Sequence, residues 1–373
     1  MGALTGIRIA DFSRVLAGPY ATMLLGDLGA DVIKVERPPA GDDTRQWGPP
    51  FDAHGNATYF ASVNRNKHSV ALDLGSESGR ADAIRLIRSC DVLVENFVPG
   101  TMERFGLGYD HLAVAQPGLI YASISGFGRS EAAAGLPGYD LLVQAVGGLM
   151  SVTGPNADTP TKAGVALVDV ITGTHLAVGI LAALRHRDAT GTGQRVDASL
   201  LASLLSAMVN QASAYVGAGV IPRAMGNAHP SISPYEVFET ADRPIALAVG
   251  NDRQFAACVA VLEAPALADD PRFRTNALRV ENRDALRRLL QAALSEAGAD
   301  VWSARFTAAG VPCGPVNSIA EAFALAEALG ESATVAVDGV PTVAHPLKLS
   351  LTPAEYRCPP PAVGDTEIDA VLP

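Results

Sequence analysis

The sequence predicts an α/β fold: a Rossmann-like, doubly wound parallel sheet in a large domain, joined to a smaller α+β domain. In the first 200 residues, short runs rich in Val and Ile alternate with segments of helical periodicity. Such alternation is typical of a parallel sheet covered by helices on both faces. After about residue 215 the alternation ends and helical patterns predominate. The composition, 48% hydrophobic and 18% charged, is that of a globular protein with a large core.

The large domain is expected to contain strands at residues 7–12, 31–36, 69–74, 91–95, 119–124 and 195–197. A helix is expected over residues 19–28, because Pro19 suits a first helical turn and Gly29 a helix end. An amphipathic helix should follow at residues 76–88. Several strands end in polar or glycine-containing turns, and ligands of such sheets bind beyond the carboxyl ends of the strands. These turns are therefore expected to line the site.

The domain boundaries are placed where the hydropathy pattern and the composition of the chain change. Residues 1–215 form the first part of the large domain, residues 226–320 the small domain, and residues 330–373 return to the large one. In the small domain we expect a strand at 245–249 and helices at 253–262, 282–297 and 299–309. Residues 342–351 resemble a strand that rejoins the large domain.

Charge and composition exclude several classes of protein. With 39 acidic and 28 basic residues, the chain lacks the basic face of a nucleic-acid binder. Four scattered cysteines without metal-ligand spacing indicate free thiols in a reducing compartment and no metal site. No secretory signal is visible, and no apolar run approaches 18 residues, so we expect a cytoplasmic protein without a membrane partner. Only Gly18 follows the first strand where a dinucleotide loop has three glycines, which argues against NAD, FAD or ATP.

Asp169 is the residue that best indicates chemistry. It lies between the apolar residues 165–168 and an apolar helix over 170–184. A carboxylate in such surroundings is costly to desolvate unless it is paired, capped or used. Two interpretations follow from the residues alone: Asp169 is the N-cap of the helix, or it is a carboxylate nucleophile toward an activated acyl group. Basic residues near strand ends, Arg37, Lys67 and Arg104, are candidates for phosphate contacts or simply solvated charges.

The chain closely resembles the class III CoA-transferases, the family of formyl-CoA transferase and carnitine CoA-transferase. The resemblance covers nearly the whole length, because many short segments recur in the family's order and spacing. They are Asp11-Phe12, Ala17-Gly18-Pro19, residues 28–36, Gly41-Asp42, residues 64–67, Val94-Glu95-Asn96-Phe97, Gly138-Tyr139-Asp140 and Ala166-Leu167-Val168-Asp169.

This resemblance implies that Asp169 is the nucleophile, which carries first the acyl group as an anhydride and then CoA as a thioester. It also implies an interlocked, ring-like homodimer, with a CoA thioester as substrate and no permanently bound cofactor. Carried over, the CoA-binding residues are Val15, Ala17, Arg37, Asn96, Phe97 and Arg104, and the oxyanion donors come from Gly250 and Asn251, where the family's glycine run is shortened. Candidates for the acid-binding site are Arg14, Trp47, Arg65, Tyr139 and Asp140.

The substrates are expected to be succinyl-CoA as donor and a small dicarboxylic acid as acceptor. Residues 226–230 and 250–252 resemble the branch of the family with those substrates, and Arg14 or Arg65 could hold the distal carboxylate of the acid. An alternative is an alpha-methylacyl-CoA racemase, which shares the aspartate. Its histidine is replaced here by Tyr139, and a tyrosine, with a pKa near 10, is a poor base. A second alternative is a non-catalytic CoA-binding protein.

Overall fold

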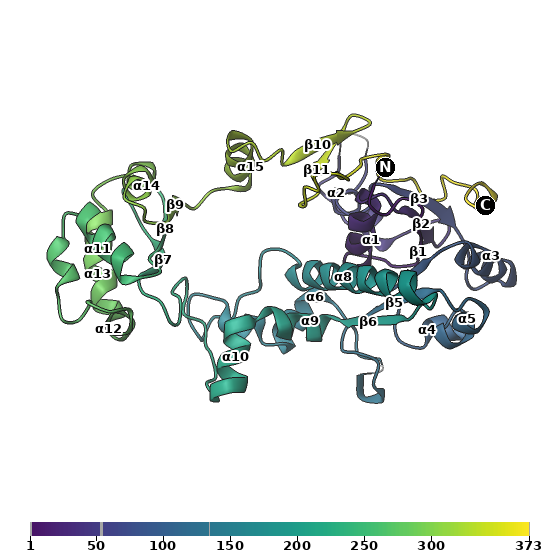
Figure 1. The fold of residues 1–373 in the computed structure, drawn as a ribbon, viewed down its shortest axis with the longest axis horizontal. Helices are drawn as coiled ribbons and strands as arrows, with labels where there is room; N and C mark the ends of the chain where they lie inside the picture. Colours follow the sequence, from purple (N-terminus) through teal and green to yellow (C-terminus); the bar gives the residue numbers. More distant parts are fainter. Residues whose placement is uncertain (1, 53–54, 134, 373) are drawn as a thin grey trace. The chain divides into compact units, whose positions relative to one another are not determined.

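The structure, a computed structural model, describes residues 2–52, 55–133 and 135–372. The chain forms two compact units (Figure 1). The first unit runs up to Leu149 and continues with Lys162–Ile221 and the residues from Ser332 onward. The second unit consists of Met150–Thr161 and Pro222–Glu331. It therefore contains residues 226–320, which we expected in the small domain, and adds the segment 150–161.

The first unit is built on a six-stranded sheet in the order β3-β2-β1-β4-β5-β6, with every neighbouring pair parallel. The strands are β1 (Arg8–Asp11), β2 (Asp31–Glu36), β3 (Lys67–Ala71), β4 (Val92–Glu95), β5 (Ile120–Ser125) and β6 (Arg195–Ser199). The predicted α/β fold with a parallel sheet is confirmed. The third strand begins two residues earlier than expected and ends three residues earlier. Lys67 at its start is polar yet buried, so the hydropathy of the sequence does not reveal this part of the strand.

Helices cover both faces of this sheet. One face packs against α1 (Ala17–Asp27), α8 (Leu167–Thr190) and α9 (Leu200–Ala207). The other face packs against α3 (Glu77–Arg88), α4 (Thr101–Arg104) and α5 (Tyr109–Ala115). Strands β1, β2, β4 and β5 are largely buried on both sides, which explains why they read as mostly apolar runs in the sequence. Further helices of this unit are α2 (Thr58–Ala61), α6 (Asp140–Val146) and α10 (Val209–Ala218), and α7 (Leu149–Val152) lies at its border.

The C-terminal segment returns to the first unit but adds no strand to its main sheet. Instead, β10 (Thr334–Val337) and β11 (Val340–Val343) pair with each other as an antiparallel hairpin. The expected strand over residues 342–351 is therefore wrong beyond Val343. Pro346 lacks a backbone N–H to donate to a ladder, which is one reason that strand pairing does not continue.

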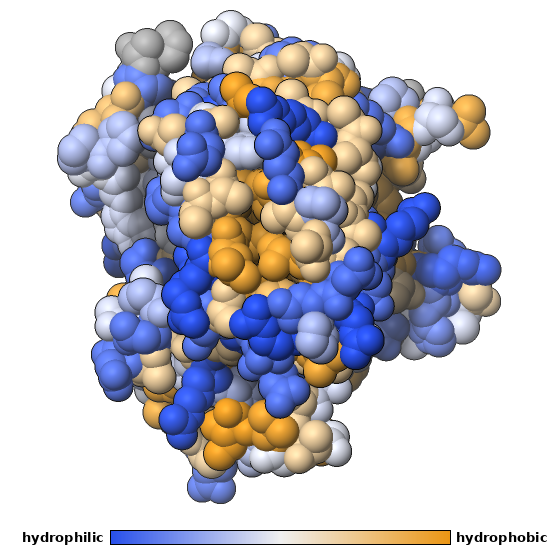
Figure 2. Space-filling model, turned by 90° about the vertical axis from the view of Figure 1, so that its left-hand side faces the viewer, coloured by the Kyte–Doolittle hydropathy of each residue, from blue (hydrophilic) through white to orange (hydrophobic). Residues whose placement is uncertain are grey.

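The second unit combines a three-stranded antiparallel sheet with helices. Its strands are β7 (Tyr235–Phe238), β8 (Ile245–Ala248) and β9 (Cys313–Pro315). Its helices are α11 (Asp252–Val261), α12 (Asn276–Glu281), α13 (Arg283–Leu294), α14 (Ala299–Ala308) and α15 (Ile319–Ala328). A buried cluster that includes Phe238, Phe255, Leu290 and Phe306 forms its core. On the side of the molecule shown in Figure 2, hydrophilic residues predominate and hydrophobic residues gather in separate patches.

Helix α8 corrects one expectation from the sequence. It has 24 residues and, by length and composition alone, could cross a membrane, although no apolar run of that length was expected. Less than half of its most apolar stretch is buried, but that buried part, including Leu176, Ile180 and Leu184, belongs to the core on the sheet. In the described residues, α8 is therefore a core helix of the first unit.

The approach of α8 to α1 depends on Gly173. A Cβ atom at this position would lie 2.4 Å from the carbonyl oxygen of Ala17. Alanine favours a helix over glycine, yet we expect Gly173→Ala to lower the free energy of unfolding by about 1–3 kcal/mol, because the clash forces the two helices apart. Urea unfolding measures this change. The exposed Thr174→Ala on the same helix should stay within about 0.5 kcal/mol, and equal effects of the two variants would show that packing at Gly173 is unimportant.

Candidate active site

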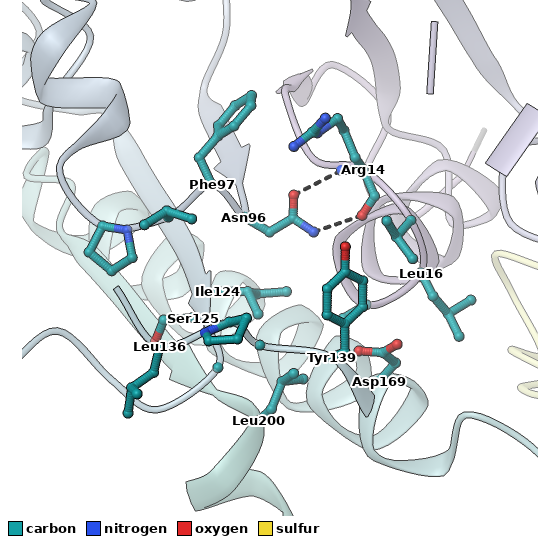
Figure 3. A pocket seen from close by; sticks show the side chains of 17 residues that line it. Arg14, Leu16, Asn96, Phe97, Ile124, Ser125, Leu136, Tyr139, Asp169 and Leu200 are labelled. Carbon is teal, nitrogen blue, oxygen red and sulfur yellow. Dashed lines mark hydrogen bonds between the residues drawn. The ribbon is translucent and has the colours of Figure 1, made fainter. Parts of the chain in front are cut away.

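A cavity of about 300 Å³ opens at the carboxyl ends of β1, β4 and β5 (Figure 3). The strand order reverses between β1 and β4, and ligands of such sheets bind at this switch point. The loops after these strands supply most of the lining, and α8 contributes Asp169. The lining includes Arg14, Val15, Leu16, Ala17, Asn96, Phe97, Ser125, Gly126, Leu136, Pro137, Tyr139 and Asp169. The turns that we expected to line the site after β1, β4 and β5 thus meet in one place.

Asp169 lies in the first turn of α8 but does not cap it. The helix begins at Leu167, so Asp169 is its third residue, and the cap position is Ala166. The carboxylate of Asp140 takes the capping role, because its Oδ1 accepts the N–H groups of Val168 at 2.8 Å and of Asp169 at 3.2 Å. The N-cap interpretation of Asp169 is therefore wrong.

The Asp169 carboxyl is electrostatically unfavourable as an anion. Burial, together with the nearby charge of Asp140, raises its pKa from 3.8 to about 7. No group among the described residues donates a hydrogen bond to it that would offset this effect. A carboxylate that is poorly stabilised by its surroundings binds a proton more tightly and is more reactive toward a carbonyl carbon. Asp169 is thus suited to form a covalent bond at near-neutral pH.

This pKa predicts how the reaction of Asp169 depends on pH. The protonated carboxyl is not a nucleophile, so covalent labelling of Asp169 by an acyl-CoA should increase as the pH rises through about 7 and then level off. Asp140→Asn, which can still accept the two N–H groups, should move the midpoint down by up to about one pH unit. Single-turnover labelling between pH 5 and 9 measures both. A rate independent of pH would contradict the raised pKa.

Four of the six predicted CoA-binding residues line the cavity: Val15, Ala17, Asn96 and Phe97. The polar atoms of Asn96 are directed at the loop rather than at open space, since its Oδ1 accepts the Arg14 N–H at 2.9 Å and its Nδ2 donates to the Arg14 carbonyl at 2.7 Å (Figure 3). Val15 has a φ of +70°, which costs a β-branched residue roughly 1–3 kcal/mol. The loop is therefore held in a strained conformation.

The three basic candidates for phosphate contacts lie outside this lining. Arg37 and Arg104 are exposed at the ends of β2 and α4, where a phosphate contact stays a prediction. The prediction for Lys67 is wrong, because Lys67 is 1% exposed and its ammonium donates to Asp11 at 3.1 Å and Asn64 at 2.9 Å. The residues before Lys67 in the sequence, 64–66, are all polar, so the sequence contained no sign that Lys67 is buried.

Among the acid-binding candidates, Arg14 and Tyr139 line the cavity. Arg14 is partly exposed and pairs with Asp43 at 3.3 Å, and its guanidinium lies 5.2 Å from the centre of the Phe97 ring. Its Nε is buried and has no hydrogen-bond partner among the described residues. Arg14 therefore has one hydrogen-bond donor that no group in the described residues satisfies. Trp47 is not in the lining but contacts the ring of Tyr59, with 5.2 Å between ring centres.

Two acid-binding candidates are corrected by the structure. Arg65 is buried and both arms of its guanidinium are engaged, with Asp27 at 2.6 Å and with Thr342 at 3.1 Å. It cannot hold a substrate carboxylate without breaking this buried ion pair. The carboxylate of Asp140 is also engaged, since besides capping α8 it accepts a hydrogen bond from Gln144 at 2.6 Å. Both residues support the structure around the site rather than line it.

Sequence reasoning missed Tyr59 as a residue of this region. Burial raises the pKa of its hydroxyl, and the charges of Asp169 and Asp140 raise it further, which shows that the hydroxyl lies within their field. Tyr59 belongs to a small apolar cluster with Leu16 and Met23. No local signal in the sequence placed Tyr59 near Asp169, because the approach of α2 to α8 depends on tertiary contacts alone.

Gly250 and Asn251, the predicted oxyanion donors, belong to the second unit. The Gly250 N–H donates to the side-chain oxygen of Gln254 at 2.9 Å, and the Asn251 side chain caps α11 by accepting the Gln254 N–H at 2.9 Å. In this conformation the Gly250 N–H is not available to an oxyanion, so the assignment of these two residues stays a prediction. Within the described residues, no group of three or more His, Cys, Asp or Glu side chains could hold a metal ion.

Comparison with known proteins identifies the family. The sequence model described as "CoA-transferase family III" matches residues 4–367. The chain belongs to CoA-transferase family III. It is 44% identical over 373 residues to succinate–glutarate CoA-transferase of Agrobacterium fabrum, covering 97% of this chain and 93% of that protein. It is 40% identical to acetyl-CoA:oxalate CoA-transferase of Acetobacter aceti, with coverage of 94% and 90%.

A solved structure also matches this chain over nearly its whole length. The crystal structure of a CAIB/BAIF family protein from Brucella suis is similar with a TM-score of 0.88 and 40% identity, covering 98% of this chain and 97% of that one. The family and enzyme class predicted from the motifs are thus confirmed for this CoA-transferase.

Proposed function

We propose that this CoA-transferase moves CoA from succinyl-CoA to a small dicarboxylic acid, with Asp169 as the covalent carrier. The observation that carries the proposal is the position of Asp169: a partly buried carboxyl with a pKa of about 7, unpaired in the described residues, on the wall of the cavity at the strand switch point. Each nucleophile in the proposed reaction is a carboxylate or a thiolate. The proposal therefore assigns no step to a metal or a bound cofactor.

Each step exchanges one carboxylate or thiolate for another. The Asp169 carboxylate attacks the thioester carbonyl, the C–S bond breaks, and a mixed anhydride and the CoA thiolate result. The thiolate attacks the Asp169 acyl carbon, which releases succinate and leaves an aspartyl-CoA thioester. The acceptor carboxylate then displaces the thiolate to form a second anhydride, and the thiolate attacks the acceptor carbonyl, which restores the Asp169 carboxylate.

Mass spectrometry of the intact protein and of its proteolytic peptides tests this carrier role. After incubation with succinyl-CoA and no acceptor, the protein should gain the mass of CoA minus water on the peptide that contains Asp169. Addition of a dicarboxylic acid should remove the adduct and yield the new thioester. An acyl-CoA hydrolysed or exchanged without any adduct on this peptide would argue against the carrier.

The choice of a dicarboxylate rests on Arg14 and on the two relatives above. The acids in the names of these two relatives, glutarate and oxalate, are both dicarboxylic acids. Arg14 lines the cavity of this chain, and its Nε has no hydrogen-bond partner among the described residues. A guanidinium recognises a carboxylate through two parallel hydrogen bonds. We assign the distal carboxylate of the acceptor to Arg14, the pantetheine arm to Val15, Ala17 and Phe97, and the CoA phosphates to Arg37 and Arg104.

This assignment predicts a selective loss of affinity in Arg14→Gln. The KM for glutarate should rise about 10- to 100-fold, because a charge-assisted hydrogen bond contributes about 1.5–3 kcal/mol. The KM for valerate, which has the same chain length but no distal carboxylate, should change by less than about 3-fold. Steady-state kinetics with both acids measure the difference, and equal changes would rule out the dicarboxylate assignment.

The same proposal includes a homodimer, in the interlocked ring-like form that the family resemblance implies. Large apolar side chains on and after α10 are exposed, which is typical of a surface that binds another protein: Val209, Tyr215, Val216, Val220 and Ile221. Sedimentation at low micromolar concentration should give twice the monomer mass of 38.6 kDa. All four cysteines are free thiols, which supports a reducing cytoplasm as the location.

A further inference from the structure

The loop between β1 and α1 forms one wall of the Asp169 cavity through Arg14, Val15 and Leu16. Its sharpest point is Val15, whose φ of +70° lies in the left-handed region that β-branched residues rarely adopt. The loop belongs to no helix or strand. A strained backbone of this kind persists only where the surrounding structure holds it.

Two side chains hold the peptide groups on either side of Arg14. The Lys34 ammonium donates to the Ser13 carbonyl at 2.9 Å and to the Asp42 carboxylate at 3.0 Å. Asp42 in turn accepts the Val15 N–H, at 3.2 and 3.3 Å from its two oxygens. Both Lys34 and Asp42 side chains are 0% exposed. Neither residue lines the cavity, so the pair reaches the site only through the backbone of the loop.

Asn96 and Thr44 add hydrogen bonds to the loop and to Asp42. Asn96 binds both backbone groups of Arg14 (Figure 3), so three successive residues of the loop are held by side chains from β2 and from the segments that follow β2 and β4. Asp42 is itself oriented by Thr44, whose N–H and hydroxyl donate to it at 3.0 and 2.8 Å. The carboxylate therefore has a single orientation available.

Stability alone does not account for such a pair. Removing two opposite charges from water is costly, and apolar side chains of similar volume often stabilise a protein at least as well. What a buried, fully bonded pair provides is geometry, since its hydrogen bonds specify where each partner lies. Here the specified partners are the two peptide groups that flank Arg14.

We propose that Lys34 and Asp42 are positioning residues of the active site, which hold the loop of residues 13–15 so that its wall presents the acyl-CoA correctly to Asp169. The inference rests on the function proposed above. A reacting group displaced by about 1 Å can lose up to about 100-fold in rate. Loosening this loop should therefore impair acyl-CoA binding and the covalent step in a protein that remains folded.

Asp42→Asn is the test variant. Asparagine keeps the shape and can still accept from Thr44, but its amide group would face the Val15 N–H and the Lys34 ammonium, which are donors like itself. We expect the single-turnover rate of CoA adduct formation at Asp169 to fall about 10- to 100-fold, with a raised KM for succinyl-CoA. Rates are compared at a temperature where circular dichroism shows the variant fully folded.

Asp27→Asn is the matched control. Asp27 is also a buried carboxylate in an ion pair, with Arg65 at 2.6 Å, and its contacts with Arg65, Asn66 and His345 do not include the loop. This variant should melt at a lower temperature but react within about 2-fold of the natural rate while folded. Equal slowing in the Asp27 and Asp42 variants would reduce the effect to general destabilisation and overturn the proposal.

A milder variant covers the case in which Asp42→Asn does not fold. Thr44→Val retains the ion pair but removes the hydroxyl that orients Asp42, so a 3- to 10-fold slower adduct formation is expected. Natural rates and KM values in whichever Asp42 and Thr44 variants fold would overturn the proposal.

If the natural protein forms no adduct at all, the proposed function fails instead. Calorimetric binding of CoA then decides the positioning role, which predicts at least 10-fold weaker binding in these variants and is overturned by unchanged binding.

Discussion

Asp169→Ala and Asp169→Asn should each lower the rate of CoA transfer by about 10⁴-fold or more, because loss of a covalent nucleophile removes the whole reaction path rather than one contact. The CoA adduct should be absent from both variants. The matched control is Asp188→Asn, which changes an exposed carboxylate on the same helix, about five turns away. It should react at the natural rate. Transfer at near-normal rates in the alanine variant would end the carrier hypothesis.

The same variants should be more stable than the natural protein at alkaline pH. Folding raises the pKa of Asp169 from 3.8 to about 7, so the folded state binds a proton more tightly than the unfolded chain. The contribution of this group to stability is therefore complete below about pH 4 and is lost as the pH rises through 7. At pH 8 the anion is buried at a cost, and Asp169→Asn removes that cost.

Chemical unfolding of Asp169→Asn at pH 8 and pH 5 measures this effect. We expect a gain of about 2 kcal/mol at pH 8 that becomes smaller toward pH 4. A gain of this sign in an inactive variant is the usual consequence of a site selected for reactivity rather than stability. A gain that does not vary with pH would mean that the ionisation of Asp169 is not its cause.

Arg65→Met should be among the most destabilising single changes in the first unit. Asp27 would remain buried, and its remaining side-chain partners among the described residues would be the Asn66 amide at 2.7 Å and the His345 ring at 3.2 Å. Removing one partner of a buried ion pair costs about 3–5 kcal/mol. The loss also frees Thr342, in the C-terminal hairpin, from its contact with Arg65. Urea unfolding of Arg65→Met measures the decrease.

Arg14→Gln is the informative comparison, because both arginines were candidates for the acceptor carboxylate. Arg14 is partly exposed, and an exposed ion pair contributes only about 0–1 kcal/mol, so its loss should leave stability nearly unchanged while it raises the KM for glutarate. Arg65→Met should lower the free energy of unfolding and leave the KM for glutarate nearly unchanged. If the Arg65 variant is as stable as the natural protein and selectively loses affinity for the dicarboxylate, the structural role assigned to Arg65 is wrong. Replacing Asp27 and Arg65 together by apolar residues should recover part of the stability.

Much of the fold was predictable because local patterns report burial. The strands β1, β2, β4 and β5 are apolar runs buried on both faces, and their bounds agree with the expected ones to within one or two residues. The predictions failed where a polar residue is buried, as at the start of β3, or where a segment pairs outside the main sheet, as at β11. In both cases tertiary contacts decide what the sequence pattern leaves open.

The candidate site was predictable in part for a similar reason. Turns at strand ends can be read from the sequence, and they contain Arg14, Asn96 and Phe97, which line the cavity. The roles of charged residues could not be read in this way. Arg65 and Lys67 look like exposed cations in the sequence, yet each is neutralised by a carboxylate distant along the chain, Asp27 or Asp11.

The sequence by itself determined the alternation of strands and helices and the family, and it identified Asp169 as the candidate nucleophile, because these depend on residue types and spacing along the chain. Only the tertiary structure decided that Asp140 rather than Asp169 caps α8, that Arg14 and not Arg65 faces the cavity, and that Lys34 and Asp42 hold its wall. The physical reason is that desolvation and ion pairing depend on which groups meet in space. A one-dimensional pattern identifies a carboxylate, but its neighbours determine whether it is a cap, a counter-ion or a nucleophile.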